Sequence, residues 1–480
     1  MLFNSLDFLW FFPLIAVVYF STPAAWRIVV LLAAGLWFYA SWEPSYLLIL
    51  FACIFAAHFG ALAIDRSSQR RRTFWLVISM LIPFGMLLAF KYYNFFADTV
   101  QQLGRRIDSS FNPPLLRFAL PVGISFFTFK TMSYLFDVHR GATPAEHSFL
   151  KTATYVSFFP QILAGPIERA GNFLPQLDRK HAVDAGRITD GLALMLWGLF
   201  KKAVIADNLA VVVNWVYLAP ENYKGLPLIV ATYTYAFQIY CDFSGYSDMA
   251  IGAARVLGFS TMKNFNRPYA ATSVGEFWRR WHISLSTWFR DYVYIPLGGN
   301  RVALWKWTRN VMIVFLISGL WHGSYWTFII WGGLHGLFLV GERLLTPAFS
   351  RAAQTVRLNT YPRVVTALRV GLTFNLVAFS WVFFRSETVG DALYITQHLF
   401  EGLDRGFTEA LAVFRSDDLI LAAILVAVLF TAQYIRRAQG ALEWLRRRPS
   451  YVRWAVYAVL VLAIVNLRPE HNTGFIYLQF

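Results

Sequence analysis

The sequence predicts an all-α, polytopic membrane protein, and its composition and apolar runs are the observations that predict it. The chain has 480 residues, of which 57% are hydrophobic, 18% aromatic and only 15% charged, and its mean hydropathy is +0.47. A soluble protein of this length carries about a quarter charged residues. Apolar runs long enough to span a bilayer recur from end to end, which excludes a soluble fold.

Each apolar run is expected to form a helix, and we expect about 11 to 13 crossings because some runs are too short to span alone. The short ones are expected to be re-entrant or buried within the bundle, where broken backbone is shielded. Residues 1–480 are treated as one integral-membrane domain with a polar excursion at 385–418. The apolar segments lie at 8–20, 26–40, 45–64, 74–98, 115–136, 149–165, 191–218, 227–256, 308–320, 325–341, 365–384, 418–435 and 451–467.

The charge distribution predicts how the chain is oriented in the membrane. The net charge is +16, but the basic residues are scattered between apolar segments, which disfavours a nucleic-acid partner. The basic loops 66–72, 342–369 and 436–453 are expected to be cytoplasmic by the positive-inside rule. Segment 451–467 then runs outward, so the C-terminal tail, including residues 475–480 (FIYLQF), is predicted to lie on the periplasmic side.

Targeting and cysteine signals add little to this picture. The N-terminal MLFNSLDFLWFF has no basic region ahead of its apolar stretch and is interpreted as a retained first helix. The two cysteines, Cys53 and Cys241, form neither a metal-binding spacing nor a disulfide framework.

Polar side chains gather in the apolar segment that contains QIYCDFSGYSDMAIG. A charge at the centre of a membrane helix costs at least about 2.5–3.5 kcal/mol, so such residues usually face a polar interior. Asp242 and Tyr246 are four residues apart, as are Ser244 and Asp248, so each pair shares a helix face. A supporting hydrogen-bond network is favoured over direct chemistry for Asp242, Tyr246 and Asp248.

The next stretch, 263–301, is predicted to be a re-entrant, partly interfacial element rather than a spanning helix. Residues that interrupt a regular helix recur in it, namely Pro268, Pro296, Gly298 and Gly299. Its arginines, among them Arg279, Arg280 and Arg290, are either interfacial anchors or ligands for the phosphates of an anionic cytoplasmic substrate. Forked guanidinium groups suit phosphates well.

Two histidines, His282 and His322, are the candidate catalytic residues. A lone histidine in an apolar stretch is more often structural, but two in aromatic, glycine-rich surroundings favour a role in chemistry. A haem pair stays open, whereas zinc is disfavoured because no third ligand lies at a suitable spacing. No metal is therefore predicted. His335 is expected to be structural.

Several long motifs resemble the membrane-bound O-acyltransferase (MBOAT) family, and in particular its bacterial branch of alginate O-acetyltransferase membrane subunits. They are LPVGISFFTF (120–129), FFPQILAGPIER (158–169), YCDFSGYSDMAIG (240–252), NFNRPY (264–269), FWRRWHISLSTWFRDYVYIPLGGNR (277–301) and GLWHGSYWTFIIWGGLHG (319–336). The terminal FIYLQF is also similar to the family's ending, although Leu478 replaces the common aromatic residue.

The resemblance implies an MBOAT-like bundle around a central tunnel, with His322 of the WHG motif as the catalytic residue and His282 of the WHIS motif in the same site. A neutral, buried histidine is available as a base for the hydroxyl that receives an acyl group. We expect His322 to be the general base and His282 to be an orienting or oxyanion-stabilising partner. The expected donor is acetyl-CoA from the cytoplasm, as a substrate, with no bound cofactor.

The receiving hydroxyl is open at this stage. The acceptor is either a polysaccharide directly or Tyr477, whose phenol has a pKa near 10 and is more easily deprotonated than a sugar alcohol. Tyr477 would then pass the acetyl group to a periplasmic or membrane-anchored acetyltransferase partner. Alternatively, FIYLQF is only an aromatic interfacial anchor.

The leading function is therefore O-acetylation of an alginate-like exopolysaccharide from the bacterial inner membrane. Peptidoglycan O-acetylation and teichoic-acid D-alanylation are alternatives within the enzyme class. A transporter of an acyl donor or glycan is the alternative from another class, although no paired repeat of the kind common in transporters is present.

Overall fold

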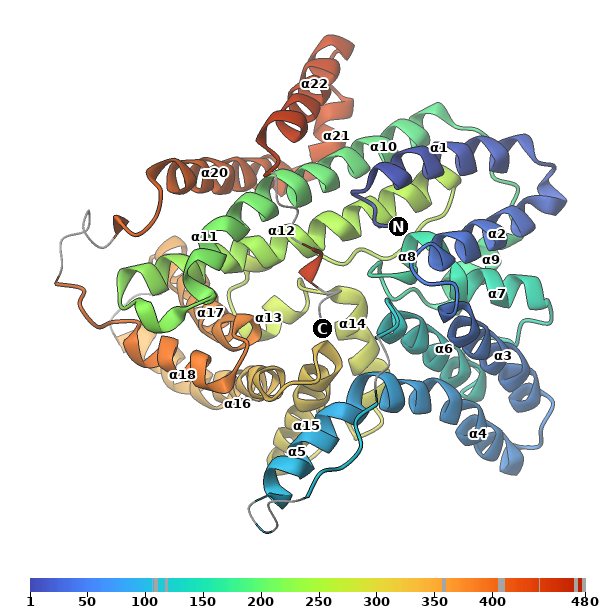
Figure 1. The fold of residues 1–480 in the computed structure, drawn as a ribbon, viewed down its shortest axis with the longest axis horizontal. Coiled ribbons are helices and arrows are strands. Elements are labelled where there is room, and N and C mark those ends of the chain that lie inside the picture. Colours follow the sequence, from blue (N-terminus) through green and yellow to red (C-terminus); the bar gives the residue numbers. More distant parts are fainter. Residues whose placement is uncertain are drawn as a thin grey trace. The chain divides into compact units, whose positions relative to one another are not determined.

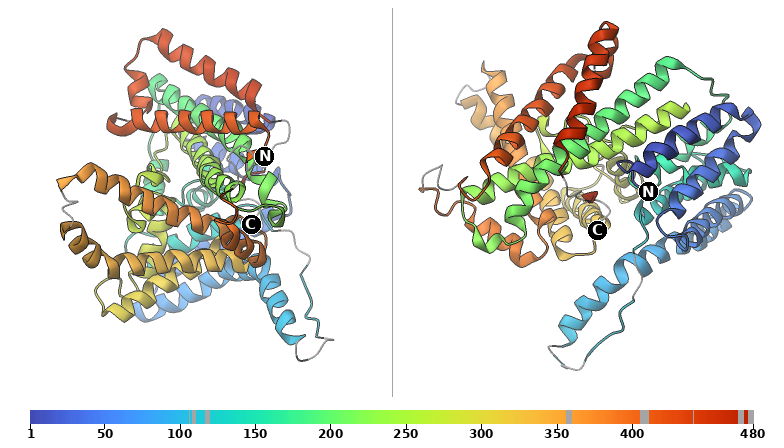
Figure 2. Two further views of the ribbon diagram at one scale, coloured as in Figure 1. Left: turned by 90° about the vertical axis from the view of Figure 1, so that its left-hand side faces the viewer. Right: turned by 45° about the horizontal axis from the view of Figure 1, so that its top comes forward.

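The computed structural model describes residues 1–105, 107, 111–116, 120–355, 360–404, 411–439, 441–469 and 474–476. These residues form helices, turns and connecting segments and contain no strand (Figures 1 and 2), so the predicted all-α class is confirmed. The chain divides into two compact units. Unit 1 comprises Met1–Met195 and Ser247–Met262, and unit 2 comprises Leu196–Tyr246 and Lys263–Phe480. Two helices, α10 (Ala185–Phe200) and α12 (Leu226–Leu257), contribute residues to both.

Unit 1 is built around α3, which packs against α4, α6 and α7. Gly60 of α3 makes this packing close, since a Cβ atom there would overlap the side chain of Ser79 in α4. Besides its share of α10 and α12, its α-helices are α1 (Leu6–Ser21), α2 (Arg27–Ala40), α3 (Tyr46–Asp65), α4 (Gln69–Leu87), α5 (Tyr93–Gly104), α6 (Ile124–His139), α7 (Phe149–Ser157), α8 (Phe159–Ile162) and α9 (Ala170–Leu177).

Two expected helices of unit 1 differ from their predicted ranges. The segment expected at 149–165 is broken into α7 and α8, because Pro160 is tolerated only in the first turn of a helix. The segment expected at 115–136 becomes helical only at Ile124. Gly123, which precedes α6, has a φ of 75°, a left-handed conformation that glycine adopts without a steric penalty.

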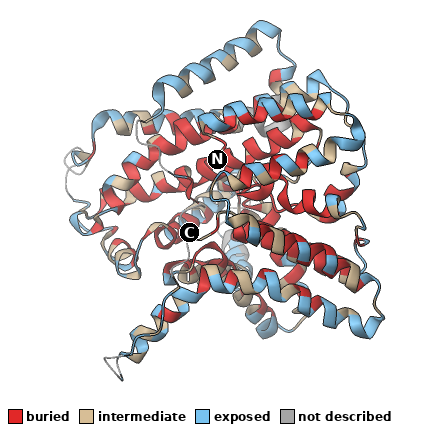
Figure 3. Cartoon of the chain, turned by 45° about the vertical axis from the view of Figure 1, so that its right-hand side comes forward, coloured by how far each residue is buried: buried red, intermediate tan, exposed pale blue. Residues whose placement is uncertain are grey.

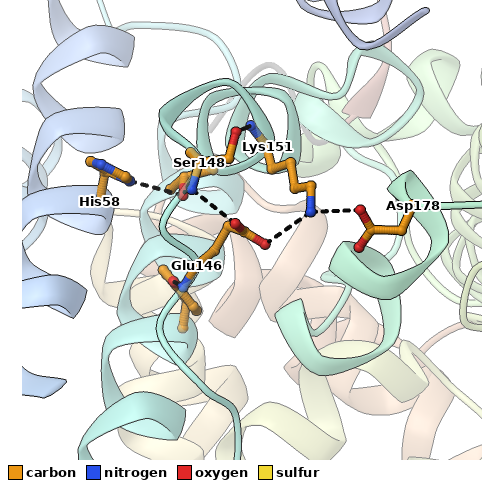
Figure 4. Close-up of polar contacts among 7 residues, drawn as sticks. His58, Glu146, Ser148, Lys151 and Asp178 are labelled. Atoms are coloured by element: carbon orange, nitrogen blue, oxygen red, sulfur yellow. Dashed lines mark hydrogen bonds and ion pairs between the residues drawn. The ribbon is translucent and has the colours of Figure 1, made fainter. Parts of the chain in front are cut away.

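A partly exposed ion-pair cluster joins α7 to its neighbours in unit 1 (Figure 4). The Nζ atom of Lys151 lies 2.6 Å from a carboxylate oxygen of Asp178 and 3.6 Å from one of Glu146. Ser148 is the N-cap residue directly before α7, and its backbone N–H donates to Glu146 at 2.8 Å. All of these charges are paired, so the cluster is interpreted as an anchor for the loop before α7.

Unit 2 contains a closely packed pair of helices, α15 and α16, joined by a three-residue loop at 323–325. Gly319 and Gly332 lie where the two helices meet, and a Cβ atom on either would overlap a carbonyl oxygen of the other helix. The remaining α-helices of unit 2 are α11 (Asp207–Tyr217), α13 (Val274–Trp278), α14 (Ile283–Phe289), α17 (Pro362–Arg385), α18 (Val389–His398), α20 (Ser416–Gln439), α21 (Ala441–Arg446) and α22 (Ser450–Leu467), with α15 spanning Leu304–His322 and α16 spanning Trp326–Thr355.

The stretch 263–301 is interrupted, as predicted. It consists of the short helices α13 and α14, a π-helical turn at Arg290–Tyr294, and turns around Gly298 and Gly299, both of which have positive φ. Residues 279–282, between α13 and α14, are not part of a long helix. One of them, His282, places its side chain in the interior of unit 2.

The described residues include six helical stretches long and apolar enough to cross a membrane, which makes the chain a multi-pass membrane protein. The count of 11 to 13 crossings and the central tunnel stay predictions. No residue of α22 is buried (Figure 3), as expected for a helix in contact with lipid. The six stretches are Tyr46–Asp65, Gln69–Gly104, Trp326–Phe349, Pro362–Arg385, Ser416–Gln433 and Ser450–Leu467.

Candidate functional site

His322 is the last residue of α15 and is buried in an aromatic environment within unit 2. Its ring centroid lies 4.9 Å from those of both Trp321 and Trp331, with the planes nearly perpendicular. Gly323 follows directly, and a Cβ atom at this position would overlap the ring of Phe328. The glycine therefore allows α16 to close against the histidine at the end of α15.

His282 immediately precedes α14 and is completely buried. Its backbone is left-handed, with φ 42° and ψ 54°. This conformation is uncommon for residues other than glycine and tends to persist where the surrounding structure holds it, often at functional sites.

Asn264 holds the ring of His282 in one orientation. Its Oδ1 atom lies 3.2 Å from Nδ1 of His282 and accepts hydrogen bonds from the hydroxyl and the backbone N–H of Ser284, at 2.7 and 3.3 Å. A backbone N–H can only donate, so the Asn264 atom is the oxygen and Nδ1 of His282 must carry a proton. Burial lowers the pKa of His282 to about 3. The ring is therefore neutral at pH 7, with its lone pair on Nε2.

The fold of unit 2 brings the two candidate histidines together, although forty residues separate them in the sequence. Their ring centroids are 6.3 Å apart and their planes are inclined by 62°. Phe243 of α12 packs edge-on against His282, at 4.6 Å between centroids. Two imidazole rings thus lie close together in an apolar, aromatic environment.

His335 has a different environment. Its Nδ1 atom accepts from the indole N–H of Trp278 at 3.2 Å, and its Nε2 atom lies 2.9 Å from the hydroxyl of Ser380. Because both ring nitrogens are engaged, His335 fits the expected structural role of joining α13, α16 and α17.

Asp242 and Tyr246 contact the described part of the C-terminal tail. An Asp242 oxygen accepts from the backbone N–H of Ile476 at 2.9 Å, and the ring of Tyr246 stacks on Phe475 at 4.4 Å. Asp242 also pairs with Lys202 at 2.6 Å. Asp248 lies further along α12, in the part that belongs to unit 1, and is less buried. Tyr477 lies outside the described residues.

The three candidate donor-binding arginines are more exposed than the histidines. Arg280 is 2.5 Å from Glu276, and Arg290 is 2.7 Å from Asp291. Hydrogen bonds from Thr272 and the charge of Arg280 hold the pKa of Glu276 below its usual value, despite an opposing contribution from burial. Arg280 and Arg290 are therefore already paired with carboxylates. Arg279 and Arg290 are exposed, and Arg280 is half-buried.

Sequence reasoning did not single out Asn264, Lys202 or Asp207. Asn264 stands in the NFNRPY motif, but nothing local distinguishes it from an ordinary loop residue. Lys202 and Asp207 are charged residues inside the apolar segment 191–218. That placement is itself a signal, because charges inside a membrane helix need partners.

A helical, multi-pass membrane protein with a buried pair of histidines is the class that the fold and the site define. The sequence matches the membrane-bound O-acyltransferase (MBOAT) family over residues 4–381. The chain belongs to this family and is an O-acyltransferase, which excludes the alternative of a transporter without catalysis.

Several bacterial proteins are similar over most of the chain. A protein named probable alginate O-acetylase from Pseudomonas aeruginosa is 39% identical over 406 residues, which cover 83% of this chain and 75% of that protein. The peptidoglycan O-acetyltransferase of Helicobacter pylori is 36% identical over 400 residues, covering 78% and 73%. The teichoic acid D-alanyltransferase of Bacillus subtilis is 28% identical over 282 residues, covering 55% and 69%.

Proposed function

We propose that this chain transfers an acetyl group from cytoplasmic acetyl-CoA, across the bacterial inner membrane, for the O-acetylation of an alginate-like exopolysaccharide. The similarity to alginate O-acetylases over most of both chains supports this substrate class. The observation that carries the proposal is the buried pair of His282 and His322 in the same unit as a bound C-terminal segment. CoA is too polar to cross the bilayer, whereas an acetyl group is small enough to pass between side chains.

In the proposed reaction, the acceptor hydroxyl oxygen attacks the thioester carbonyl carbon of acetyl-CoA. His322 takes the hydroxyl proton as the new C–O bond forms. The C–S bond then breaks, and the proton passes to the departing CoA sulfur, so that the histidine returns to its neutral form. General base catalysis of this kind contributes about 10²–10⁴-fold.

His282 is assigned the orienting role in this scheme. An oxyanion is stabilised by a hydrogen-bond donor, but the proton of neutral His282 is on Nδ1 and faces Asn264. The Nε2 lone pair can instead accept a hydrogen bond. Of the two roles expected for His282, orienting the acceptor or His322 therefore fits its hydrogen bonds better than stabilising an oxyanion.

Tyr477 is the proposed first acceptor. It follows Ile476, whose backbone is bound to Asp242, and its phenol is more acidic than a sugar hydroxyl. A phenyl ester retains a good leaving group, so a periplasmic or membrane-anchored acetyltransferase partner can take the acetyl group onward to the polysaccharide. This scheme requires the C-terminus to be periplasmic. Arg279 is the strongest of the proposed CoA-binding arginines because it is exposed, whereas Arg280 and Arg290 are paired with Glu276 and Asp291.

The experiment that tests the proposal is incubation of the purified chain with labelled acetyl-CoA, followed by mass spectrometry of the C-terminal peptide. Wild type, His322→Ala and Tyr477→Phe are compared. Label on Tyr477 that is absent from both variants supports the relay. An unlabelled Tyr477, with CoA still released when a glycan is supplied, contradicts the relay and indicates direct transfer.

Peptidoglycan is the second candidate acceptor, because the similarity to the peptidoglycan enzyme of Helicobacter pylori is nearly as extensive as that to the alginate enzymes. The two candidates are separated by deleting the gene and measuring ester-linked acetate in isolated exopolysaccharide and isolated peptidoglycan. Loss of acetate from peptidoglycan alone would overturn the assignment to an exopolysaccharide.

A further inference from the structure

A cluster of three buried charges in unit 2 connects α11, α12 and the turn before α11. The Nζ atom of Lys202 lies 2.8 Å from an oxygen of Asp207 and 2.6 Å from one of Asp242, and all three side chains are at most 2% exposed. Lys202 stands in a π-helical turn at Lys201–Ala206. Single π-helical turns within α-helices are frequent at functional sites.

Burying these three charged groups costs free energy, and the two carboxylates can accept more hydrogen bonds than one lysine can donate. Removing ionised groups from water costs several kcal/mol per ion, and mutual attraction offsets this only if the remaining lone pairs are also satisfied. One ammonium group faces two carboxylates here. The second oxygen of Asp242 receives the backbone N–H of Ile476 at 2.9 Å, more than two hundred residues away in the sequence.

The neighbouring tail residue is bound as well. The ring of Phe475 stacks on Tyr246, one helical turn after Asp242 on α12, and lies 6.1 Å from Phe243. Phe243 in turn packs edge-on against His282. A continuous set of contacts within unit 2 therefore runs from the charge cluster, through two tail residues, to the histidine pair.

We propose that the Lys202–Asp207–Asp242 cluster is a receptor for this chain's own C-terminal segment, which it holds in register beside the histidine pair. Lys202, Asp207 and Asp242 are positioning residues, not catalytic ones. This inference rests on the proposed acyl relay through Tyr477. Because Tyr477 directly follows Ile476, the hydrogen bond to the Ile476 amide limits where the Tyr477 phenol can reach.

The recognition is suited to a segment that must be held in one register. A carboxylate that accepts from a backbone N–H makes a charge-assisted hydrogen bond, which is shorter and stronger than one between neutral groups. The contact depends on the backbone of residue 476, and the aromatic stacking depends on the side chain of residue 475. Together they define both the position and the direction of the tail.

The first test asks whether the cluster holds the tail, without reference to acyl transfer. Hydrogen–deuterium exchange of the C-terminal peptide is measured in the purified full chain for wild type, Asp242→Asn and Asp178→Asn. The control Asp178→Asn also removes a carboxylate partner of a lysine, but in unit 1 (Figure 4). We expect fast exchange in Asp242→Asn only. Exchange as slow as that of wild type in Asp242→Asn would overturn the proposal.

The second test asks whether holding the tail positions it for reaction. Label transfer from acetyl-CoA to Tyr477 is compared with transfer to a diffusible phenol, N-acetyltyrosine amide. A misplacement of about 1 Å costs on the order of 10²-fold, so we expect about this loss of Tyr477 labelling in Asp242→Asn. Labelling of the diffusible phenol should fall by no more than about tenfold, because this acceptor is not held by the Lys202–Asp207–Asp242 cluster. Equal losses with both acceptors would overturn a positioning role.

A second variant covers the case in which Asp242→Asn does not fold. Ile476→Pro removes the N–H donor but leaves all three buried charges in place, and Ile476→Ala retains the donor. Tyr477 labelling should fall much further in the proline variant than in the alanine variant. Equal labelling in the two variants would overturn the proposal that the cluster holds the tail. A slowly exchanging tail with no label on Tyr477 in wild type would instead overturn the relay, while the proposal that the cluster holds the tail would stand.

Discussion

Three histidines of unit 2, His282, His322 and His335, are buried, but their hydrogen bonds differ. His335 has partners on both ring nitrogens: the indole N–H of Trp278 donates to Nδ1, and the hydroxyl of Ser380 lies beside Nε2. These contacts join three helices. His282 is held at Nδ1 by Asn264, and its Nε2 atom is directed away from Asn264. The two hydrogen bonds of His335 thus support a structural role for it, whereas burial does not distinguish the three histidines.

The first prediction concerns His322. Replacing it with alanine should lower acetyl transfer by about 10²–10⁴-fold, because this removes the proposed general base. The rate is measured as CoA released from acetyl-CoA by the purified chain. His147→Ala, at an exposed histidine of unit 1, is the matched control and should keep its activity. A fully active His322→Ala would exclude the assigned role.

The second prediction follows from the lowered pKa of His282. The folded chain keeps this group neutral down to about pH 3, whereas an unfolded histidine takes up a proton below about pH 6.5. The unfolded state therefore binds more protons between these limits, and stability should fall as the pH drops below about 6.5 and be insensitive to this group above it.

This dependence is measured by thermal unfolding in detergent over a pH series. His282→Gln removes the titrating group, so its unfolding temperature should fall less steeply on acidification than that of wild type. Parallel curves for the two proteins would show that His282 does not contribute to the acid sensitivity.

At the scale of elements, the position of His322 depends on how closely α15 and α16 pack. Gly319 contacts the backbone at Phe328, and Gly332 contacts the backbone at Phe315. Each helix thus has a glycine where the other has a carbonyl group. Since His322 is the last residue of α15, any separation of the pair moves the histidine away from Trp331 of α16.

The third prediction tests this packing. Gly319→Ala should destabilise the chain by about 1–3 kcal/mol, as overpacked cores do, and should also lower acetyl transfer. Gly341→Ala is the control within α16, because nothing lies within 4 Å of a Cβ atom there. That variant should be neutral or slightly stabilising, since alanine favours a helix more than glycine does. Equal unfolding temperatures for the two variants would contradict the prediction.

At the scale of the whole molecule, all the candidate site residues except Asp248 and Tyr477 are described residues of unit 2. Unit 2 also contains the tail residues Phe475 and Ile476, which α12 binds near His282. Residues close to the C-terminus therefore contact α12, near the middle of the chain, as a relay through Tyr477 requires.

The fourth prediction addresses this relay in cells. Tyr477→Phe should abolish ester-linked acetate on the isolated polymer, because phenylalanine has no hydroxyl to carry the acetyl group, while the chain remains in the membrane at a normal level. Tyr451→Phe, at an exposed tyrosine of α22, is the matched control and should leave the acetate unchanged. Normal acetylation in Tyr477→Phe would contradict the relay.

The helical class, most helix ranges and the two histidines were predictable from the sequence, because apolar runs, helix breakers and motifs are local properties. The predicted segments 45–64 and 451–467 agree with α3 and α22 within a residue or two. The breaks near Pro160 and Gly123 were not predicted, since the expected segments 149–165 and 115–136 ran through both positions.

Only the tertiary structure decided which polar residues meet. His282 and His322 are forty residues apart, and the amide of Ile476 reaches Asp242 across most of the second half of the chain. The role of Asn264 depends on the left-handed backbone of His282, a conformation that no local pattern predicts. Such contacts arise from the packing of whole helices, whereas hydrophobicity and helix propensity are determined residue by residue. The sequence by itself thus determined the class and the candidate residues, and packing determined their partners.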